Sequence, residues 1–520
     1  MIYRFKINEG EYWWGGTTIS NFCPLTADSE YHQDFRNSAH NQSAPFFVST
    51  DGRYIWSDNP FKVDIEGGEF IIEGEEVALY EAGTCLRDAY KAAQAKHFPC
   101  DQVKLPKEFF RSAQYNTWME FTYYLTQDGV LEFARKWLEN GFEPGIFILD
   151  EGWHQHTAYG QWEFDFARFP DPKAMIKELH DMGYTVMLWV VPYVCTNGPA
   201  YVRTALRPQL NKNPEAAAKT FMRTKEGSVA VVPWWNGYSA ILDMTNPCDV
   251  NFLDEQLQYL MNEYGVDGFK FDGGTPSNFM SRSVVNGEFA TDKTAHEINA
   301  AWNDFGRRYR FHEYKDTYKG GGKNVIQRLH DRKPVWEGHG IDDLIPCALT
   351  AGMIGHPFIC PDMVGGGEWS YKFLPGFELD EEVFVRSAQC SALFPMMQFS
   401  WAPWQAVSEE NMGYCLEAAK LHKRMSDEII RLVEEAEMTG EPILRSLEYN
   451  DPHKGYADIV DQFMLGEDIL VAPVITKSTF EREVAFPAGE WVDEDGNVYE
   501  GNTRVVLPSP INKLLWFRRK

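Results

Sequence analysis

The sequence predicts an α/β protein: a (β/α)8 TIM barrel flanked by an N-terminal β-sandwich and a C-terminal β-sandwich domain. Strand-like patterns fill the chain up to about residue 105, apolar runs alternate with amphipathic helices between about 110 and 430, and strand-like patterns return from about 440. Repeated β–α alternation indicates a parallel sheet, and about 320 residues of it suit a barrel with insertions better than a doubly wound sheet. We therefore predict domains at 1–108, 109–438 and 439–520.

The N-terminal domain is predicted from short strands broken by Gly, Asn and Asp. The run EFIIE at 69–73, between Gly67-Gly68 and Gly74, is representative of these strands. A helix is expected over about 85–98, before Pro99.

The barrel is predicted from apolar runs that alternate with helical patterns. Its strands are expected at 146–150, 186–192 and 266–272, with later candidates at 309–312, 357–360 and 395–399. Helices are expected near 172–182 and 250–264, and a charged helical stretch at 416–437 is expected to close the barrel. The C-terminal domain should contain strands at 468–474 and 483–487.

Composition and charge narrow the classes of function. The 520 residues carry a formal net charge of −27, and a surface this acidic repels phosphate backbones and anionic lipids. We therefore expect no nucleic acid and no membrane as partner, and a small neutral substrate fits better; homo-oligomerisation stays open. Nine cysteines at wide spacings without a CxxC pair predict free thiols in a reducing compartment, hence a cytoplasmic protein.

No cofactor and no metal ion are expected. The chain contains neither GxGxxG after a strand nor GxxxxGK[ST], and it shows no metal-ligand spacing. His330 and His339 are interpreted as structural side chains in preference to metal ligands.

Carboxylates and indoles follow the predicted strands. Catalytic side chains of a (β/α)8 barrel come from the C-terminal ends of its strands, and glycoside hydrolysis needs paired carboxylates beside aromatic platforms. The candidates at these ends are Asp150, Glu151, Trp189, Lys270, Asp272, Asp331, Asp362 and Trp401.

Each candidate also has a structural interpretation. An Asp that ends a buried strand can cap the next helix, and Asp150-Glu151 can equally begin a helix or bind sugar. Asp272 is followed by two glycines, which let backbone approach a ligand, and Lys270 on the same strand face could keep its carboxylate ionised. The residues alone leave catalysis and capping equally open for Asp272.

Several ordered motifs carry a family resemblance. GFKFDGG at 268–274, HPFICPDMVGGG at 356–367, FPMMQFSWAPW at 394–404 and DQFMLGEDILVAPVI at 461–475 together resemble glycoside hydrolase family 31, as do WWNG at 234–237 and LDMTNP at 242–247. Within the family, the likeness is strongest to the branch of myogenesis-regulating glycosidases and their α-galactosidase-like bacterial relatives. It runs from about residue 112 to the end of the sequence.

The resemblance implies a retaining double displacement. Asp272 matches the position of the nucleophile, and Asp331 in RLHDRKPVW matches the acid/base of that branch. In the wider family the acid/base follows a Trp-Gly-Gly-like run, which points to the region of His339, Asp342 and Asp343, and Asp342 is the alternative.

The resemblance also implies the substrate-binding residues. Asp150 matches an Asp that binds distal hydroxyls of the −1 sugar, and Lys315 stands where close relatives have a sugar-binding Arg. Lysine offers a point charge in place of a bidentate fork. The remaining residues that match positions around the sugar are Glu151, Trp189, Trp235, Lys270, Asp362 and Trp401.

The function expected from these residues is that of a retaining, exo-acting α-glycosidase, with α-galactosides favoured. The alternatives are an α-glucosidase or related α-glycosidase of the same family, and a non-catalytic sugar-binding protein that kept the fold.

Overall fold

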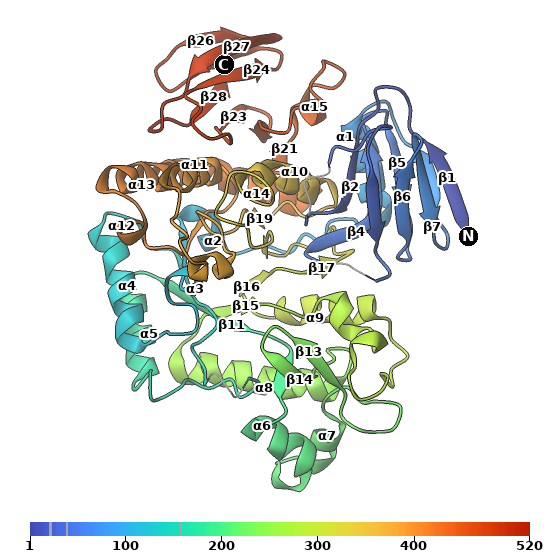
Figure 1. The fold of residues 1–520 in the computed structure, drawn as a ribbon, viewed down its shortest axis with the longest axis vertical. Coiled ribbons are helices and arrows are strands. Elements are labelled where there is room, and N and C mark those ends of the chain that lie inside the picture. Colours follow the sequence, from blue (N-terminus) through green and yellow to red (C-terminus); the bar gives the residue numbers. More distant parts are fainter. Residues whose placement is uncertain (20–22, 38–39, 156–158) are drawn as a thin grey trace. The chain divides into compact units, whose positions relative to one another are not determined.

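A computed structural model describes residues 1–19, 23–37, 40–155 and 159–520 of the chain (Figure 1). Its contacts divide the chain into two compact units. The first comprises 1–36, 41–114 and 319–520, and the second comprises 37–40 and 115–318.

The N-terminal part of the first unit consists of antiparallel sheets. One sheet has the order β1 (Ile2–Lys6), β7 (Glu69–Glu73), β6 (Lys62–Glu66) and β3 (Tyr31–Asp34), and the other contains β2 (Trp13–Thr17), β4 (Gln42–Ser49), β5 (Arg53–Trp56) and β8 (Ala78–Glu81). Side chains alternate between buried and more exposed along β6 and β7, as expected for strands with one face on a core. The buried rings of Trp13 and Phe70, one from each sheet, meet edge to face at 5.1 Å. The two sheets therefore form the expected sandwich. The helix expected over 85–98 is α1 (Leu86–His97).

The first unit also supplies the last barrel strands. β18 (Gln327–Arg328) and β19 (Ile359–Cys360) are parallel, and β20 (Gln398–Phe399) follows them along the chain. The longer helices after these strands are α10 (Leu344–Met353), α11 (Glu381–Ser391), α13 (Glu409–Arg424) and α14 (Ser426–Thr439).

The second unit contains the first barrel strands, apart from Gln114 at the start of β9. They are parallel and lie in the order β9 (Gln114–Asn116), β10 (Ile146–Leu149), β11 (Thr185–Val190), β15 (Gly268–Phe271) and β16 (Phe311–Tyr314). Every residue of β10 and β15 is buried, as helices on the outside of a parallel sheet require. Together with β18, β19 and β20, these are the strands of a (β/α)8 barrel.

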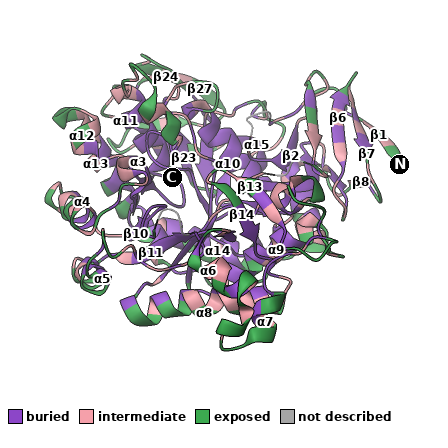
Figure 2. Ribbon diagram, turned by 60° about the horizontal axis from the view of Figure 1, so that its bottom comes forward, coloured by how far each residue is buried: buried purple, intermediate pink, exposed green. Residues whose placement is uncertain are grey.

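The longer helices of the second unit begin at residues whose side chains cap them. They are α4 (Gln127–Glu139), α5 (Pro172–Asp181), α8 (Pro247–Tyr264) and α9 (Ala295–Gly306). Thr126, Asp171 and Asn246 accept backbone N–H bonds at the starts of α4, α5 and α8, and α9 has a full capping box of Thr294 and Glu297. Figure 2 shows strands β10 and β11 buried, and α4, α5 and α8 with an exposed face.

A small antiparallel sheet in the second unit was not predicted from the sequence. It has the order β12 (Tyr193–Cys195), β14 (Gly237–Ile241) and β13 (Val231–Trp234), and it is inserted between β11 and α8. Its buried side chains join a core that includes Trp189 and Phe279. In the insertion, Trp234 of the WWNG motif ends β13, and Trp235 follows it in the β13–β14 turn.

Some expected boundaries are wrong. The strand expected at 309–312 is β16 at 311–314, because Tyr309 N–H donates to the Gly306 carbonyl in a turn after α9. The runs 357–360 and 395–399 form only the two-residue strands β19 and β20. The helical stretch expected at 416–437 is two helices, α13 and α14, which are separated at Met425.

The C-terminal part of the first unit again consists of strands. One sheet has the order β21 (Leu444–Arg445), β22 (Phe463–Leu465), β23 (Ile469–Ala472), β28 (Leu515–Arg519), β25 (Glu490–Val492) and β26 (Val498–Glu500). A two-stranded ribbon pairs β24 (Glu481–Phe486) with β27 (Thr503–Pro508). Phe486 of the ribbon packs against Phe517 of the sheet at 4.8 Å, so ribbon and sheet share one core.

Two further observations concern the predicted free thiols and the possibility of a membrane-spanning helix. All nine cysteines are free thiols, five of them buried. In the described part of the chain, no helix combines the length and apolarity that a membrane span needs. The domain boundaries 1–108, 109–438 and 439–520 stay a prediction.

Candidate active site

Asp272 directly follows strand β15. Its backbone N–H still belongs to the parallel ladder, donating to the Val190 carbonyl at 2.9 Å. One carboxylate oxygen, Oδ2, accepts a hydrogen bond from Trp189 Nε1 at 3.0 Å, and the other, Oδ1, accepts one from Gly273 N at 2.8 Å. The carboxylate is therefore oriented by an indole on the neighbouring strand and by the turn that follows it.

Both glycines after Asp272 are required by the backbone. Gly273 and Gly274 have φ of +61° and +67°, in the left-handed region. A Cβ atom on Gly273 would lie 2.7 Å from the Tyr193 ring, and one on Gly274 would lie 2.7 Å from the Trp302 ring. The glycines thus let the chain turn sharply beneath the Asp272 carboxylate.

Lys270 binds Asp150 in a buried ion pair. Its ammonium lies 2.5 Å from Asp150 Oδ2, and both side chains are almost fully buried. Asn116 Nδ2 donates to the same oxygen at 2.7 Å, and Glu151 N donates to Asp150 Oδ1 at 2.8 Å. The interpretation that Lys270 acts directly on Asp272 is therefore replaced by a direct pairing with Asp150.

Glu151 accepts hydrogen bonds from Tyr159 and from the β13–β14 turn of the inserted sheet. Tyr159 OH donates to Oε1 at 2.7 Å, Asn236 Nδ2 donates to the same oxygen, and Trp235 Nε1 donates to Oε2 at 3.2 Å. Burial, with the nearby charges of Asp150 and Asp272, raises the pKa of Glu151 to about 8. At neutral pH this carboxyl is mostly protonated. The Glu151 side chain holds Trp235 through the bond from its indole N–H. Trp235 is 53% exposed, so its ring is available as a platform for a ligand.

Arg328 hydrogen-bonds two carboxylates of the first unit, those of Asp331 and Asp362. This buried guanidinium on β18 donates through Nη1 to Asp331 Oδ1 at 2.7 Å and to Asp362 Oδ1 at 2.6 Å. Asp362 is fully buried, whereas 27% of the Asp331 side chain is exposed. Burial raises the pKa of Asp362 against the opposing charge of Arg328.

Asp362 and Asp331 thus differ in task. Asp362 Oδ2 also accepts the backbone N–H groups of Arg332 and Gly367, at 2.8 and 3.0 Å. These bonds hold two stretches of backbone, the one after β18 at Arg332 and the one after β19 at Gly367. Asp331 is held by the same guanidinium, but its side chain is 27% exposed, as suits a group that exchanges protons with substrate and water.

Asp342, the alternative acid/base, has a structural task. Its two carboxylate oxygens accept the N–H groups of Gly338 and Gly340, both at 3.0 Å. The carboxylate holds the turn that carries His339. The assignment of the acid/base to Asp331, with Asp342 as the alternative, stays a prediction.

The other expected residues lie at strand ends as well. Trp401 follows β20, donates from Nε1 to the Gly366 carbonyl at 3.2 Å, and lies under the ammonium of Lys372 at 5.4 Å from its ring centre. Lys315 directly follows β16 and is half-buried.

Within the second unit, hydrogen bonds connect the expected residues in sets. In the first set, Lys270 and the Glu151 backbone N–H both bind the Asp150 carboxylate, and Trp235 donates to the Glu151 side chain. In the second set, Trp189 donates to Asp272. The Trp189 and Trp235 rings are 6.5 Å apart, which connects the two sets. In the first unit, Arg328 joins Asp331 to Asp362. Sequence reasoning missed Arg328, because the two-residue strand β18 that carries it shows no periodic pattern and its partner Asp362 lies 34 residues away in the chain.

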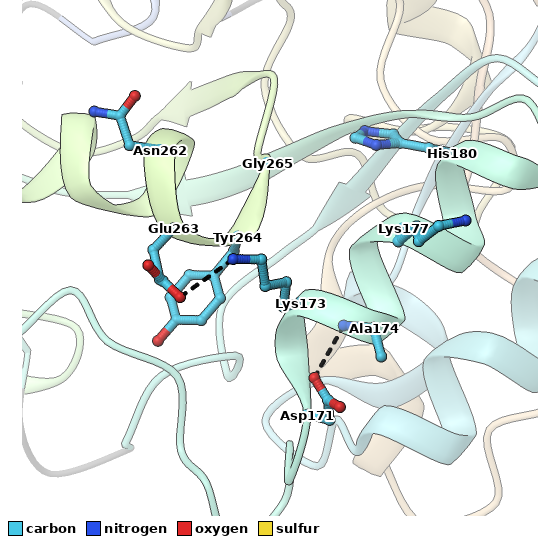
Figure 3. A pocket seen from close by; sticks show the side chains of 9 residues that line it. All are labelled: Asp171, Lys173, Ala174, Lys177, His180, Asn262, Glu263, Tyr264 and Gly265. Carbon is cyan, nitrogen blue, oxygen red and sulfur yellow. Dashed lines mark hydrogen bonds and ion pairs between the residues drawn. The ribbon is translucent and has the colours of Figure 1, made fainter.

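A cavity of about 580 Å³ lies elsewhere in the second unit (Figure 3). It is lined by α5 and the end of α8, including Asp171, Lys173, His180 and Glu263. Its lining includes none of the expected site residues, and Gly265 and His180 place it near the starts of the strands, opposite the catalytic ends.

Comparison with known proteins agrees with this geometry. The model of the glycosyl hydrolases family 31 TIM-barrel domain matches residues 108–425, and that of the family's C-terminal domain matches residues 440–520. The mouse (Mus musculus) myogenesis-regulating glycosidase is 31% identical over 445 residues, covering 83% of this chain and 59% of that protein. Alpha-glucosidase 2 of Bacillus thermoamyloliquefaciens is 27% identical, covering 75% of this chain and 50% of that protein. The chain thus spans about half to three-fifths of the length of these relatives.

Solved structures show the same fold. A dextranase of Flavobacterium johnsoniae, solved with glucose, superimposes with a TM-score of 0.82 at 20% identity, covering all of this chain and 66% of that one. A sulfoquinovosidase of E. rectale, solved with an aza-sugar inhibitor, gives a TM-score of 0.81 at 18% identity, covering all of this chain and 82% of that one. The (β/α)8 barrel with flanking strand-rich regions is thereby confirmed, and the chain belongs to glycosyl hydrolase family 31.

Proposed function

We propose that this glycosidase is a retaining, exo-acting enzyme that removes terminal α-linked sugars, with α-galactosides favoured. The observation that carries the proposal is the pair of differently held carboxylates. Asp272 is locked by Trp189 and Gly273 at the end of β15, and Asp331 is held by Arg328 with part of its surface exposed.

In this mechanism Asp272 attacks the anomeric carbon and forms a covalent glycosyl intermediate. Asp331 gives its proton to the leaving oxygen as the glycosidic bond breaks. It then takes a proton from the water that attacks the intermediate, so the released sugar keeps the α configuration and both carboxyls return to their starting states. Retaining catalysis requires the two carboxyl groups to lie roughly 5–5.5 Å apart. The separation of Asp272 and Asp331 stays a prediction of this proposal.

The sugar at the reacting position would meet charged and aromatic groups. Asp150, neutralised by Lys270, would accept hydroxyl hydrogens, and the exposed Trp235 indole would cover an apolar sugar face. Lys315 would offer one charged donor where relatives have an Arg.

The preference for α-galactosides rests on the motifs shared with the α-galactosidase-like branch of the family. The second candidate is α-glucoside hydrolysis, which the name of the Bacillus relative supports. The two sugars differ in the orientation of one hydroxyl, so a site that hydrogen-bonds this hydroxyl discriminates strongly.

Paired assays test both parts of the proposal. Nitrophenyl α-galactoside should be hydrolysed with a higher kcat/KM than nitrophenyl α-glucoside, and proton NMR should show the α anomer of the sugar as the first product. A higher kcat/KM for the glucoside would move the preference to the second candidate. The β anomer as first product would refute the retaining mechanism. Binding of both substrates without turnover would refute the proposal that the protein is an enzyme.

A further inference from the structure

The side chains of His330, His339 and Asp343 lie close together, and His330 directly precedes Asp331 in the chain. His330 follows β18, and His339 and Asp343 precede α10. Asp343 Oδ2 lies 2.8 Å from His339 Nδ1 and 3.6 Å from His330 Nε2. One nitrogen or oxygen from each of the three side chains lies within 4.8 Å of the others.

The buried atoms of this cluster lack ordinary partners. Both ring nitrogens of His330 and the Oδ1 atom of Asp343 are buried and have no hydrogen-bond partner among the described residues. His330 is 8% exposed and Asp343 is completely buried. Buried polar atoms in native proteins are nearly always satisfied, by protein, water or an ion. The cluster therefore has the donor atoms of a ligand site.

The donor types of the cluster suit a cation. The imidazoles of His330 and His339 each offer a ring nitrogen, and the Asp343 carboxyl offers an oxygen, which are ligand atoms that zinc-class ions take in proteins. The cluster thus combines two nitrogen ligands with one carboxyl ligand.

The turn that carries His339 is fixed in an unusual conformation. His339 has φ of +74°, and the N–H groups of its neighbours Gly338 and Gly340 are both held by Asp342. Its carbonyl accepts the Lys333 N–H at 2.9 Å. Strained backbone of this kind gathers at functional sites. The His339 side chain is 48% exposed, so it gives an ion a path in from solvent.

We propose that His330, His339 and Asp343 form a binding site for a divalent transition-metal ion of the zinc class. Two nitrogens and one carboxylate oxygen with a water as fourth ligand are a usual zinc set, and magnesium or calcium would demand more oxygens. Ligand atoms about 2.1 Å from a tetrahedral ion lie roughly 3.4 Å from one another, between the observed 2.8 and 3.6 Å.

Such an ion joins the two ends of the segment from His330 to Asp343. Arg332 already links these ends through its Nη2 bond to the Asp343 carbonyl at 3.2 Å. Because Asp331 follows His330 directly, the ion fixes the backbone from which that carboxylate projects. The proposal departs from the sequence-based expectation of no metal ion and of structural roles for His330 and His339. That expectation arose because positions 330, 339 and 343 do not repeat a familiar metal-ligand spacing and the three side chains meet only in the fold.

Calorimetric titration of the EDTA-treated full chain with ZnCl₂ tests the proposal. The wild type should bind one ion per chain at this site, and His339→Ala, an exposed change that spares the core, should weaken binding at least about tenfold. His330→Ala should have a similar effect. The matched control is His453→Ala. His453 also has a positive φ and lies 4.0 Å from the buried Glu448, but it belongs to no such cluster among the described residues.

Cobalt replaces zinc as a spectroscopic probe that excludes the cysteines. Co²⁺ at this site should give visible absorption of a tetrahedral nitrogen–oxygen set without a thiolate charge-transfer band, and His339→Ala should lose it. Equal zinc affinity of His339→Ala and wild type, no saturable binding by wild type, or a thiolate band that survives His339→Ala would each overturn the proposal.

Discussion

The Asp272 and Asp331 regions hold a carboxylate in opposite ways. Asp272 continues a regular parallel strand, and its oxygens are bound by an indole and by the amide of its own turn. Asp331 lies in an irregular segment after the two-residue strand β18, and a buried arginine shared with Asp362 holds it. A nucleophile needs a fixed direction of attack, whereas an acid/base needs a neighbour that tunes and steadies a proton-exchanging group. This difference implies that substitutions around the two residues should affect catalytic rate and stability differently.

The largest effect is expected from Asp272→Ala. Loss of the attacking oxygen should lower kcat by roughly 10⁴-fold or more. Folding should persist, because the change leaves space beside Trp189 without adding bulk to the β15 turn. Turnover is measured with nitrophenyl α-glycosides, and unfolding by circular dichroism. Substantial remaining activity in a folded variant would remove Asp272 as nucleophile.

Asp331→Asn should come next. General acid–base catalysis contributes typically about 10²–10⁴-fold, so kcat should fall by this factor on disaccharides. The loss should be smaller with nitrophenyl leaving groups, which depart with little need for a proton. Asp342→Asn is the matched comparison, because its carboxylate binds only the Gly338 and Gly340 amides among the described contacts. A larger leaving-group-dependent loss in Asp342→Asn would transfer the acid/base role to it.

Arg328→Met should lower the unfolding free energy of the protein by removing the cation that holds Asp331 and Asp362. The change leaves the buried Asp362 without its guanidinium, which typically costs about 3–5 kcal/mol of unfolding free energy. Arg4→Met is the control, because the Arg4–Glu69 pair is largely exposed and such pairs contribute about 0–1 kcal/mol. Denaturant unfolding compares the two variants. A loss in Arg328→Met no greater than in Arg4→Met would contradict the role assigned to Arg328.

The last prediction concerns pH and Glu151. Its pKa is about 8 in the folded chain and near 4.5 when unfolded, so folding binds its proton more tightly. The stability from this proton is complete below about pH 4.5 and is lost as pH rises through about 8. Glu151→Gln keeps a neutral group at all these pH values. Its melting temperature relative to wild type should therefore rise between pH 5 and pH 8, whereas a constant or falling difference would show that Glu151 is ionised in the folded protein.

Sequence patterns predicted the elements whose signals are local. Helices α1, α5 and α8 lie close to the ranges expected from their helical patterns, and β10 and β15 have long enough apolar runs to be recognised. Strands β9 and β18 were missed, because two or three residues cannot show a period.

The site was predicted to a similar extent. Asp272 was recognisable because its strand, its turn glycines and its carboxylate are contiguous in the chain. The link from Glu151 to Trp235 and the sharing of Arg328 between Asp331 and Asp362 were not, since these partners lie 84 and 34 residues apart. Such contacts depend on tertiary packing, which no local pattern encodes.

Azide rescue tests the central assignment most directly. With a nitrophenyl α-glycoside and sodium azide, Asp272→Ala should regain turnover and yield the β-glycosyl azide, because azide replaces the missing nucleophile in one displacement. Asp331→Ala should yield the α-glycosyl azide, because azide attacks the intermediate formed on Asp272 and needs no general base. The reverse pattern of products, or an α-azide from Asp272→Ala, would contradict the assignment of Asp272 as the nucleophile.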